Sequence, residues 1–163
     1  MIADEVDRLV RDWSRERPDL ELADLQILSR ISRIARRLEL ARKRAWRELG
    51  IEAWEFDVLA ALRRAGPPYQ LSPGELLEAT LVTSGTMTNR IDRMEGRGLV
   101  RRAPDPDDGR GIRVNLTPDG ALIADRALEA LLAGERDLLV GLGGNAERDI
   151  LTRLLRRLLV PLA

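Results

Sequence analysis

The chain of 163 residues contains no cysteine and no histidine. The lack of cysteine excludes disulfides, thiol nucleophiles and thiolate metal sites, and the lack of histidine removes the commonest metal ligand and the Ser–His and Cys–His catalytic pairs. Aromatic residues make up only 3% of the chain, so a stacking platform for single-stranded nucleic acid is not expected. These absences argue against most enzymes, and we expect no catalytic site, no metal and no cofactor.

Long apolar runs are also absent. No run approaches the roughly 18 residues that a membrane-spanning helix needs. The first residues, Met1 to Glu5, are acidic, whereas a secretory signal begins with a basic segment. The sequence therefore predicts a cytoplasmic protein without membrane contact, and its length predicts one compact domain.

The charges balance overall but are unevenly distributed. Lys and Arg together number 27, as do Asp and Glu, yet residues 30–47 carry eight basic residues against Glu39 alone. All basic residues except Lys43 are arginine. This bias fits either a GC-rich coding sequence or a use for the bidentate contacts that arginine makes with phosphate and carboxylate groups.

Apolar residues at helical spacing predict helices over most of the chain. Prolines and glycines, with the N-caps Ser72 and Thr117, mark where these helices begin and end. Apolar and polar residues that alternate on either side of a polar turn predict a β-hairpin. The expected order is a short helix before Pro18, then helices over about 19–48, 54–65, 73–80 and 83–96, a hairpin of 99–103 and 111–116, and helices over about 118–140 and 150–162.

This order is that of a winged helix-turn-helix with long helices at both ends. The predicted fold class is mainly α with a small β-hairpin wing. We divide it into N-terminal helices (1–50), a DNA-binding lobe (51–116) and C-terminal helices (117–163). The leucines of the last helix cover a face too wide for one small domain to bury, which favours a two-fold homodimer. An intramolecular helical core without a partner is the alternative.

Residues 71–120, LSPGELLEATLVTSGTMTNRIDRMEGRGLVRRAPDPDDGRGIRVNLTPDG, resemble the winged-helix core of the MarR family of bacterial transcription regulators. The stretches TNRIDRMEGRGLVRR and DDGR, and LTPDG after the wing, carry the likeness. The resemblance implies a dimer on double-stranded DNA with a pseudo-palindromic operator. Its recognition helices would enter the major groove and its wings the flanking minor grooves.

The residues of the predicted recognition helix suit this role. Short polar side chains near its start could approach base edges and phosphates, and Asn89 suits adenine. Arg110 at the tip of the wing could enter a minor groove, supported by Asp108. Residues 83–103 hold five arginines against two acids, which gives +3 per subunit. The predicted DNA-binding residues are Ser84, Thr86, Thr88, Asn89, Arg93, Arg97 and Arg110, although each alone also fits a helix cap or a solvated face.

Two charged residues fall among apolar neighbours in the predicted helices. Asp57 shares a stripe with Trp54 and Val58, and Arg90 lies between Met87 and Ile91. A buried carboxylate is costly unless it is paired or protonated. The pattern therefore predicts that Asp57 and Arg90 offset each other's burial.

The same residues resemble the urate-responsive branch of the family, which has an extra N-terminal helix. In that branch a Trp, an Asp and two Arg form the ligand site, and the matching positions here are Trp13, Asp57, Arg90 and Arg102. The resemblance implies a small-molecule effector, urate or a related purine. Arginines would bind its oxygens and Trp13 would form a flat apolar wall. A purely structural ion pair, with Trp13 in the core, is the alternative.

The sequence thus predicts a ligand-responsive, homodimeric repressor that leaves its operator when a purine binds. A constitutive MarR-type DNA-binding protein without a purine effector is the main alternative. An enzyme that uses carboxylates is disfavoured, because no paired acids converge in a recognisable motif.

Overall fold

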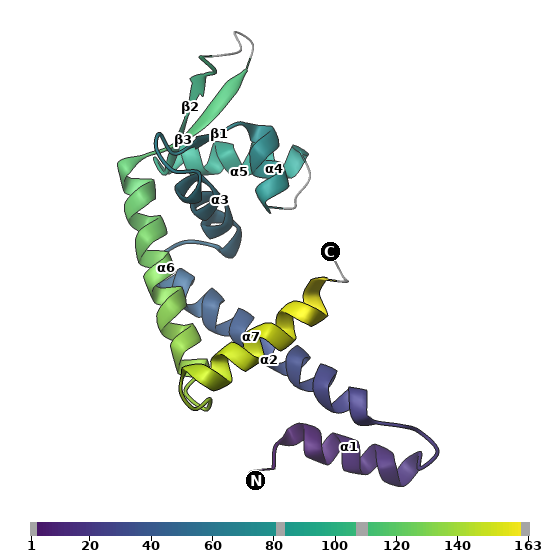
Figure 1. Ribbon diagram of the computed structural model, residues 1–163. Coiled ribbons are helices and arrows are strands. Elements are labelled where there is room, and N and C mark those ends of the chain that lie inside the picture. The colour runs from purple at the N-terminus through teal and green to yellow at the C-terminus, as the bar shows by residue number, and fades with distance from the viewer. Residues whose placement is uncertain (1–2, 81–83, 107–110, 161–163) are drawn as a thin grey trace. The chain divides into compact units, whose positions relative to one another are not determined.

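The computed structural model describes residues 3–80, 84–106 and 111–160. Helices dominate, and three short strands form a small sheet (Figure 1). The prediction of a mainly helical protein with a small β wing is confirmed. The elements are α1 (Glu5–Glu16), α2 (Ala23–Glu48), α3 (Ala53–Arg64), β1 (Gln70–Leu71), α4 (Pro73–Thr80), α5 (Ser84–Gly96), β2 (Val100–Pro104), β3 (Ile112–Leu116), α6 (Pro118–Leu138) and α7 (Asn145–Leu159).

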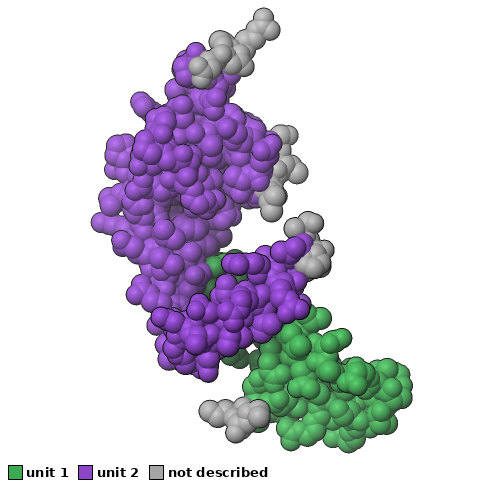
Figure 2. All heavy atoms as spheres, in the orientation of Figure 1, with its two compact units in different colours: residues 1–44 green, residues 45–163 purple. Residues whose placement is uncertain are grey.

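The chain forms two compact units, residues 1–44 and residues 45–163 (Figure 2). The first contains α1 and most of α2, and Val6 of α1 is buried in it with 1% of its surface exposed. The second contains the remaining elements, so the predicted segments 51–116 and 117–163 lie in the same unit. Among the residues described, no helix is long and apolar enough to cross a bilayer.

The sheet has the order β1-β3-β2, with both pairs antiparallel. In the predicted hairpin, Arg102 of β2 lies opposite Val114 of β3. Strand β1 was not predicted, and it pairs Gln70 with Asn115. Two residues are too few to show an alternating pattern, so this strand leaves no periodic signal in the sequence.

The core of the second unit lies between α3, α4, α5 and the sheet. Met87, Ile91 and Met94 form the buried face of α5, as the helical spacing predicted. Side chains from neighbouring elements complete the cluster, among them Val58, Leu59, Leu62, Leu76, Val100 and Val114. Burial of this one face fixes which side of α5 is left for solvent or a ligand.

The predicted N-caps are present at two helix starts. Ser72 Oγ accepts the Glu75 N–H at 3.2 Å, and the Ser72 N–H donates to Glu75 at 2.7 Å, which completes a capping box. Thr117 Oγ1 accepts the Gly120 N–H at 3.0 Å. A Cβ at Gly120 would lie 2.0 Å from the Leu99 carbonyl oxygen, so only glycine lets α6 start this close to the chain before β2.

Helix α7 has no buried residue. Ile150, Leu154, Leu155 and Leu158 each expose 42–50% of their surface, and Leu159 exposes 69%. On α6, Leu122, Leu128, Leu132 and Leu138 are also at least 43% exposed. The single chain therefore leaves two long helices with apolar side chains in contact with water.

Candidate nucleic-acid interface and effector site

The first half of α5 presents small polar residues on the side opposite the core. Gly85, Thr86, Thr88 and Asn89 are exposed, whereas Met87 between them is buried. Short polar side chains at the start of a helix are able to reach base edges, and the N-terminal end of a helix dipole favours phosphate. Ser84 begins the helix, but its side chain lies outside the described residues, as do Asp108 and Arg110 of the wing.

The end of α5 and the residue that follows it are held against the start of α3. Arg97 Nη1 donates to Glu55 at 2.5 Å, and Arg97 Nη2 donates to the Gly50 carbonyl oxygen at 2.8 Å. Arg93 Nη2 donates to Glu52 at 2.7 Å. The two arginines that were predicted to reach phosphates therefore form ion pairs inside the protein.

Trp54 lies within the same contact. The guanidinium carbons of Arg93 and Arg90 lie 4.8 Å and 5.3 Å from the centre of the Trp54 ring, within the range of cation–π attraction. The Trp54 indole N–H donates to Glu52 at 2.8 Å. This indole hydrogen bond, followed by that from Arg93, lowers the pKa of Glu52. Trp54 thus connects α3 to α5 through two arginines.

The charge near α5 is smaller than the local sequence indicated. The five arginines of residues 83–103 are set against Asp92 and Glu95 of the same stretch and against Glu52 and Glu55 of the α3 start. The net charge of the assembled group is therefore +1 per subunit, not +3. The sequence count missed the two glutamates because they lie about 40 residues earlier in the chain.

Arg102 of β2 connects the wing to α5. Its guanidinium donates to Asp92 at 2.5 Å and to Glu95 at 2.6 Å, and its backbone N–H donates to Glu95 at 2.7 Å. This backbone hydrogen bond, together with the guanidinium, lowers the pKa of Glu95. On β3, Arg113 pairs with Glu75 of α4 at 3.0 Å and with Asp105 at 2.7 Å. Arginines thus hold both strands of the wing, Arg102 against α5 and Arg113 against α4.

The predicted burial of Asp57 is wrong. Asp57 is exposed, and the buried carboxylate of α3 is Glu55, with 0% of its surface accessible. The helix turns its 55, 58, 59 and 62 face into the core, not the stripe that included residue 57. Glu55 also accepts the Glu52 N–H at 2.8 Å, and a Glu at the third position of a helix, as in a capping box, was the signal that could have identified it.

Asp57 instead lines a cavity of about 210 Å³ beside Arg64, with Phe56, Ala60, Ala79 and Thr80. Arg64 also lines a neighbouring cavity of about 170 Å³ between α3 and α6. Apart from Arg63, Arg64 and Asp125, that cavity is lined by Phe56, Ala60, Ala124, Leu128 and Leu131. An exposed arginine at the edge of apolar walls suits a planar anion.

The other predicted effector residues have different surroundings. Arg90 lies over Trp54, and Arg102 binds Asp92 and Glu95. Trp13 belongs to the first unit, where it is 48% exposed beside Leu9. No group of His, Cys, Asp or Glu side chains that could hold a metal occurs in the described part of the chain.

Sequence comparison places these features in a known family. A sequence model of the MarR family matches residues 49–111. The regulator PecS of Dickeya dadantii, named an HTH-type transcriptional regulator, is 36% identical over 135 residues, which cover 83% of this chain and 81% of PecS. This chain belongs to the MarR family.

Solved structures agree with this assignment. A mutant of MarR from E. coli in complex with operator DNA matches with a TM-score of 0.67 and 28% identity, covering 90% of this chain and 97% of MarR. A structure of Bordetella bronchiseptica BpsR, whose DNA binding is regulated by 6-hydroxynicotinic acid, matches with a TM-score of 0.65 and 28% identity over 82% of this chain and 98% of BpsR. The chain is a DNA-binding transcription regulator of the MarR family, and its relatives are regulators, not enzymes.

Proposed function

We propose that this MarR-family protein is a homodimeric repressor that binds a pseudo-palindromic operator and is released by a small anionic heterocycle. The observation that carries the DNA-binding part is the exposed polar face at the start of α5, formed by Thr86, Thr88 and Asn89 above a buried apolar face. The MarR–operator complex supports the same use of the fold. Half-sites about one helical turn (~10 bp) apart would fit a two-fold dimer.

The apolar faces of α6 and α7 support the dimer. Leucines that are about half exposed recur on both helices, and burying an apolar side chain contributes roughly 1.5–3 kcal/mol. In a two-fold dimer, the exposed leucines of α6 and α7 would be buried against a second copy of the chain.

The effector part of the proposal rests on the two cavities that share Arg64. We propose that the ligand places its ring against Phe56 and Ala60 and its charge near Arg64, with Asp57 accepting a ring N–H. Urate and related purines have this chemistry. So does 6-hydroxynicotinic acid, the ligand of BpsR, which makes hydroxylated nitrogen heterocycles the ligand class to test. Trp13 belongs to the other unit, and its contact with the ligand is implied only by the resemblance to the urate-responsive branch.

Helix α3 offers a direct route from this site to DNA. It lines both cavities and carries Trp54, on which Arg90 and Arg93 of α5 are stacked. A ligand that shifts α3 would therefore shift α5 through these stacked arginines. Differential affinity for the two positions of α5 is what such a switch requires.

The test is fluorescence anisotropy with an operator selected from a random DNA library, at one fixed salt concentration. We expect Asn89→Ala to weaken binding by about 1–3 kcal/mol. Millimolar urate or 6-hydroxynicotinic acid should weaken wild-type binding by about 1–3 kcal/mol. Arg64→Gln should remove the ligand response and leave operator affinity unchanged.

Two results would count against the proposal. If no DNA sequence is enriched over random DNA, the α5 face does not read bases. If neither compound changes the affinity of wild type, the proposed ligand class is wrong, and the alternative of a constitutive DNA-binding regulator is favoured.

A further inference from the structure

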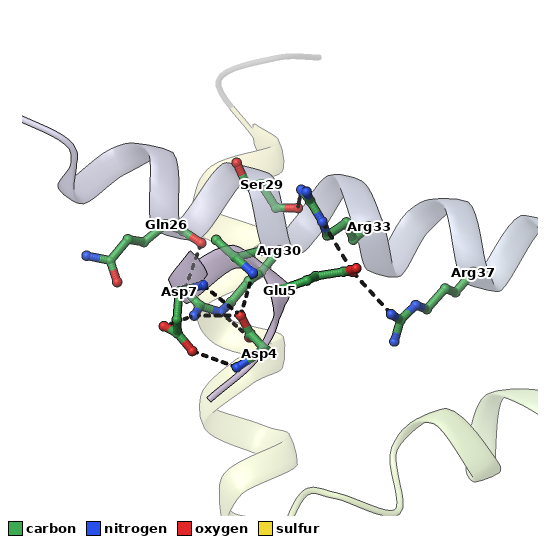
Figure 3. Close-up of polar contacts among 9 residues, drawn as sticks. Asp4, Glu5, Asp7, Gln26, Ser29, Arg30, Arg33 and Arg37 are labelled. Atoms are coloured by element: carbon green, nitrogen blue, oxygen red, sulfur yellow. Dashed lines mark hydrogen bonds and ion pairs between the residues drawn. The ribbon is translucent and has the colours of Figure 1, made fainter. Parts of the chain in front are cut away.

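In the first unit, the start of α1 lies against a row of arginines on α2 (Figure 3). The arginines are spaced by three and four residues, so they share one face of the helix. Three carboxylates from α1 and its cap face them. The groups involved are Arg30, Arg33 and Arg37 on α2, and Asp4, Glu5 and Asp7 near the chain start.

The Arg30 half of this cluster is structural. Asp4 caps α1 by accepting the Val6 and Asp7 N–H groups at 2.7 and 3.1 Å. Arg30 binds Asp4 through Nε at 2.8 Å and Asp7 through Nη2 at 2.6 Å. Its side-chain hydrogen bond is the main cause that lowers the pKa of Asp4 from 3.8 to about 2. These three residues hold the helix start in place.

The Glu5 half is held more loosely. Arg33 and Arg37 both approach a single oxygen, Glu5 Oε1, at 3.2 and 3.1 Å. Guanidinium–carboxylate contacts normally measure about 2.7–2.9 Å, so neither contact is tight. In the described part of the chain Glu5 takes no part in the helix cap, and 48% of its side chain is exposed. Glu5 is therefore able to turn away without disturbing α1.

A cavity of about 330 Å³ opens between these groups, with Val6 and Ile34 among its lining residues. Its volume is more than ten times the roughly 10–15 Å³ that a cavity needs to hold one water molecule. Around Glu5 two guanidinium groups face one carboxylate among the described residues, which leaves an excess of one positive charge. With Glu5 turned away, two forked donors of charge +2 face the cavity.

We propose that Arg33 and Arg37 form a binding site for a phosphate group, at which Glu5 is a replaceable internal counterion. A phosphate dianion matches the charge of two guanidinium groups, and its oxygens accept their paired N–H donors. A carboxylate ligand carries the same single charge as Glu5, so it would gain no electrostatic energy by displacing Glu5. The site lies wholly within residues 1–44 and is independent of the operator and effector proposals.

The test is isothermal titration calorimetry of the full chain with inorganic phosphate and, separately, with a nucleoside monophosphate, at constant ionic strength. We expect binding that falls at least about tenfold in Arg33→Gln and in Arg37→Gln, because each loses charge-assisted hydrogen bonds. Glu5→Gln should tighten binding about fivefold, because the competing carboxylate is gone. Tighter binding of the nucleotide would identify the natural ligand as a phosphate ester, and equal binding of both would identify it as free phosphate.

Arg36→Gln is the matched control, since it removes the same charge from the same helix outside the cavity. Its phosphate affinity should equal that of wild type. Side-chain Nε resonances of Arg33 and Arg37, but not of Arg36, should shift with phosphate in NMR spectra, which reports on the site even if a variant is poorly folded. Unchanged resonances, weaker binding in Glu5→Gln, or equal affinity for acetate would each overturn the proposal.

Discussion

Removal of Arg97 tests whether the buried carboxylate of Glu55 depends on it. Glu55 has no exposed surface, and the hydrogen bonds described for it come from Arg97 at 2.5 Å and the Glu52 N–H at 2.8 Å. Arg97→Met keeps the length of the side chain but removes its donors and charge. In this variant we expect the buried Glu55 carboxylate to keep only the hydrogen bond from the Glu52 N–H among those described.

Breaking a buried pair from one side costs about 3–5 kcal/mol. Arg97 is 43% exposed, so water is able to enter where the guanidinium was, and we expect the lower end, about 3 kcal/mol. For a chain of this size that loss lowers Tm by roughly 6–12 °C. Removing the charge as well, in Glu55→Gln with Arg97→Met, should recover at least about 1 kcal/mol, because a neutral amide costs less to bury.

Arg93→Met is the matched control. Its partner Glu52 is 57% exposed, and Arg93 itself is 60% exposed. An exposed pair contributes up to about 1 kcal/mol, and the stacking on Trp54 adds about 0.5–1 kcal/mol, so the loss should not exceed about 2 kcal/mol. Urea unfolding followed by tryptophan fluorescence would compare the variants. Equal losses for Arg93→Met and Arg97→Met would refute the reasoning, because burial would then make no difference.

Three further predictions concern other parts of the molecule. Gly120→Ala should lower the free energy of unfolding by at least about 1–3 kcal/mol, because the new Cβ would lie 2.0 Å from a carbonyl oxygen. Gly134→Ala in the same helix is the control, and it should not lower Tm in thermal unfolding. The side-chain hydrogen bond from Arg63 lowers the pKa of Asp125 below 3.8, so the ionised carboxylate stabilises the folded state. The difference in Tm between wild type and Asp125→Asn should therefore be constant well above pH 3.8 and should shrink as the pH falls below it. Leu151→Asp with Leu155→Asp should give monomers or insoluble chains in light scattering, because charges would enter the proposed dimer interface; an unchanged dimer would contradict that interface.

Much of the fold could be predicted from local signals. The caps at Ser72 and Thr117 and the inner face of α5 are set by neighbours within a few residues, so periodicity and cap chemistry are enough to find them. Helix α2 begins at Ala23, close to the predicted residue 19. Strand β1 was missed because its pairing with β3 joins residues about 45 positions apart.

The candidate site depended more on distant contacts. The exposed face of α5 followed from the helical period, but its role in reading DNA stays a prediction. The partners of Arg93 and Arg97 could not be predicted, because they sit on another helix. Asp57 was placed on the wrong face because α3 has apolar residues on more than one side, including the partly buried Trp54. The helical period alone is then compatible with two different buried faces.

The ion pairs of Arg93 in α5 and of Arg97 just after it also set how the protein should respond to salt. Each phosphate that a protein neutralises releases counterions and adds about 0.9 to the slope of log affinity against log salt concentration. Arg93 and Arg97 have carboxylates as partners, so they have little charge left to exchange with DNA. Operator affinity should therefore depend on salt less steeply than the number of arginines in this segment implies, and the contribution of base contacts should be correspondingly greater.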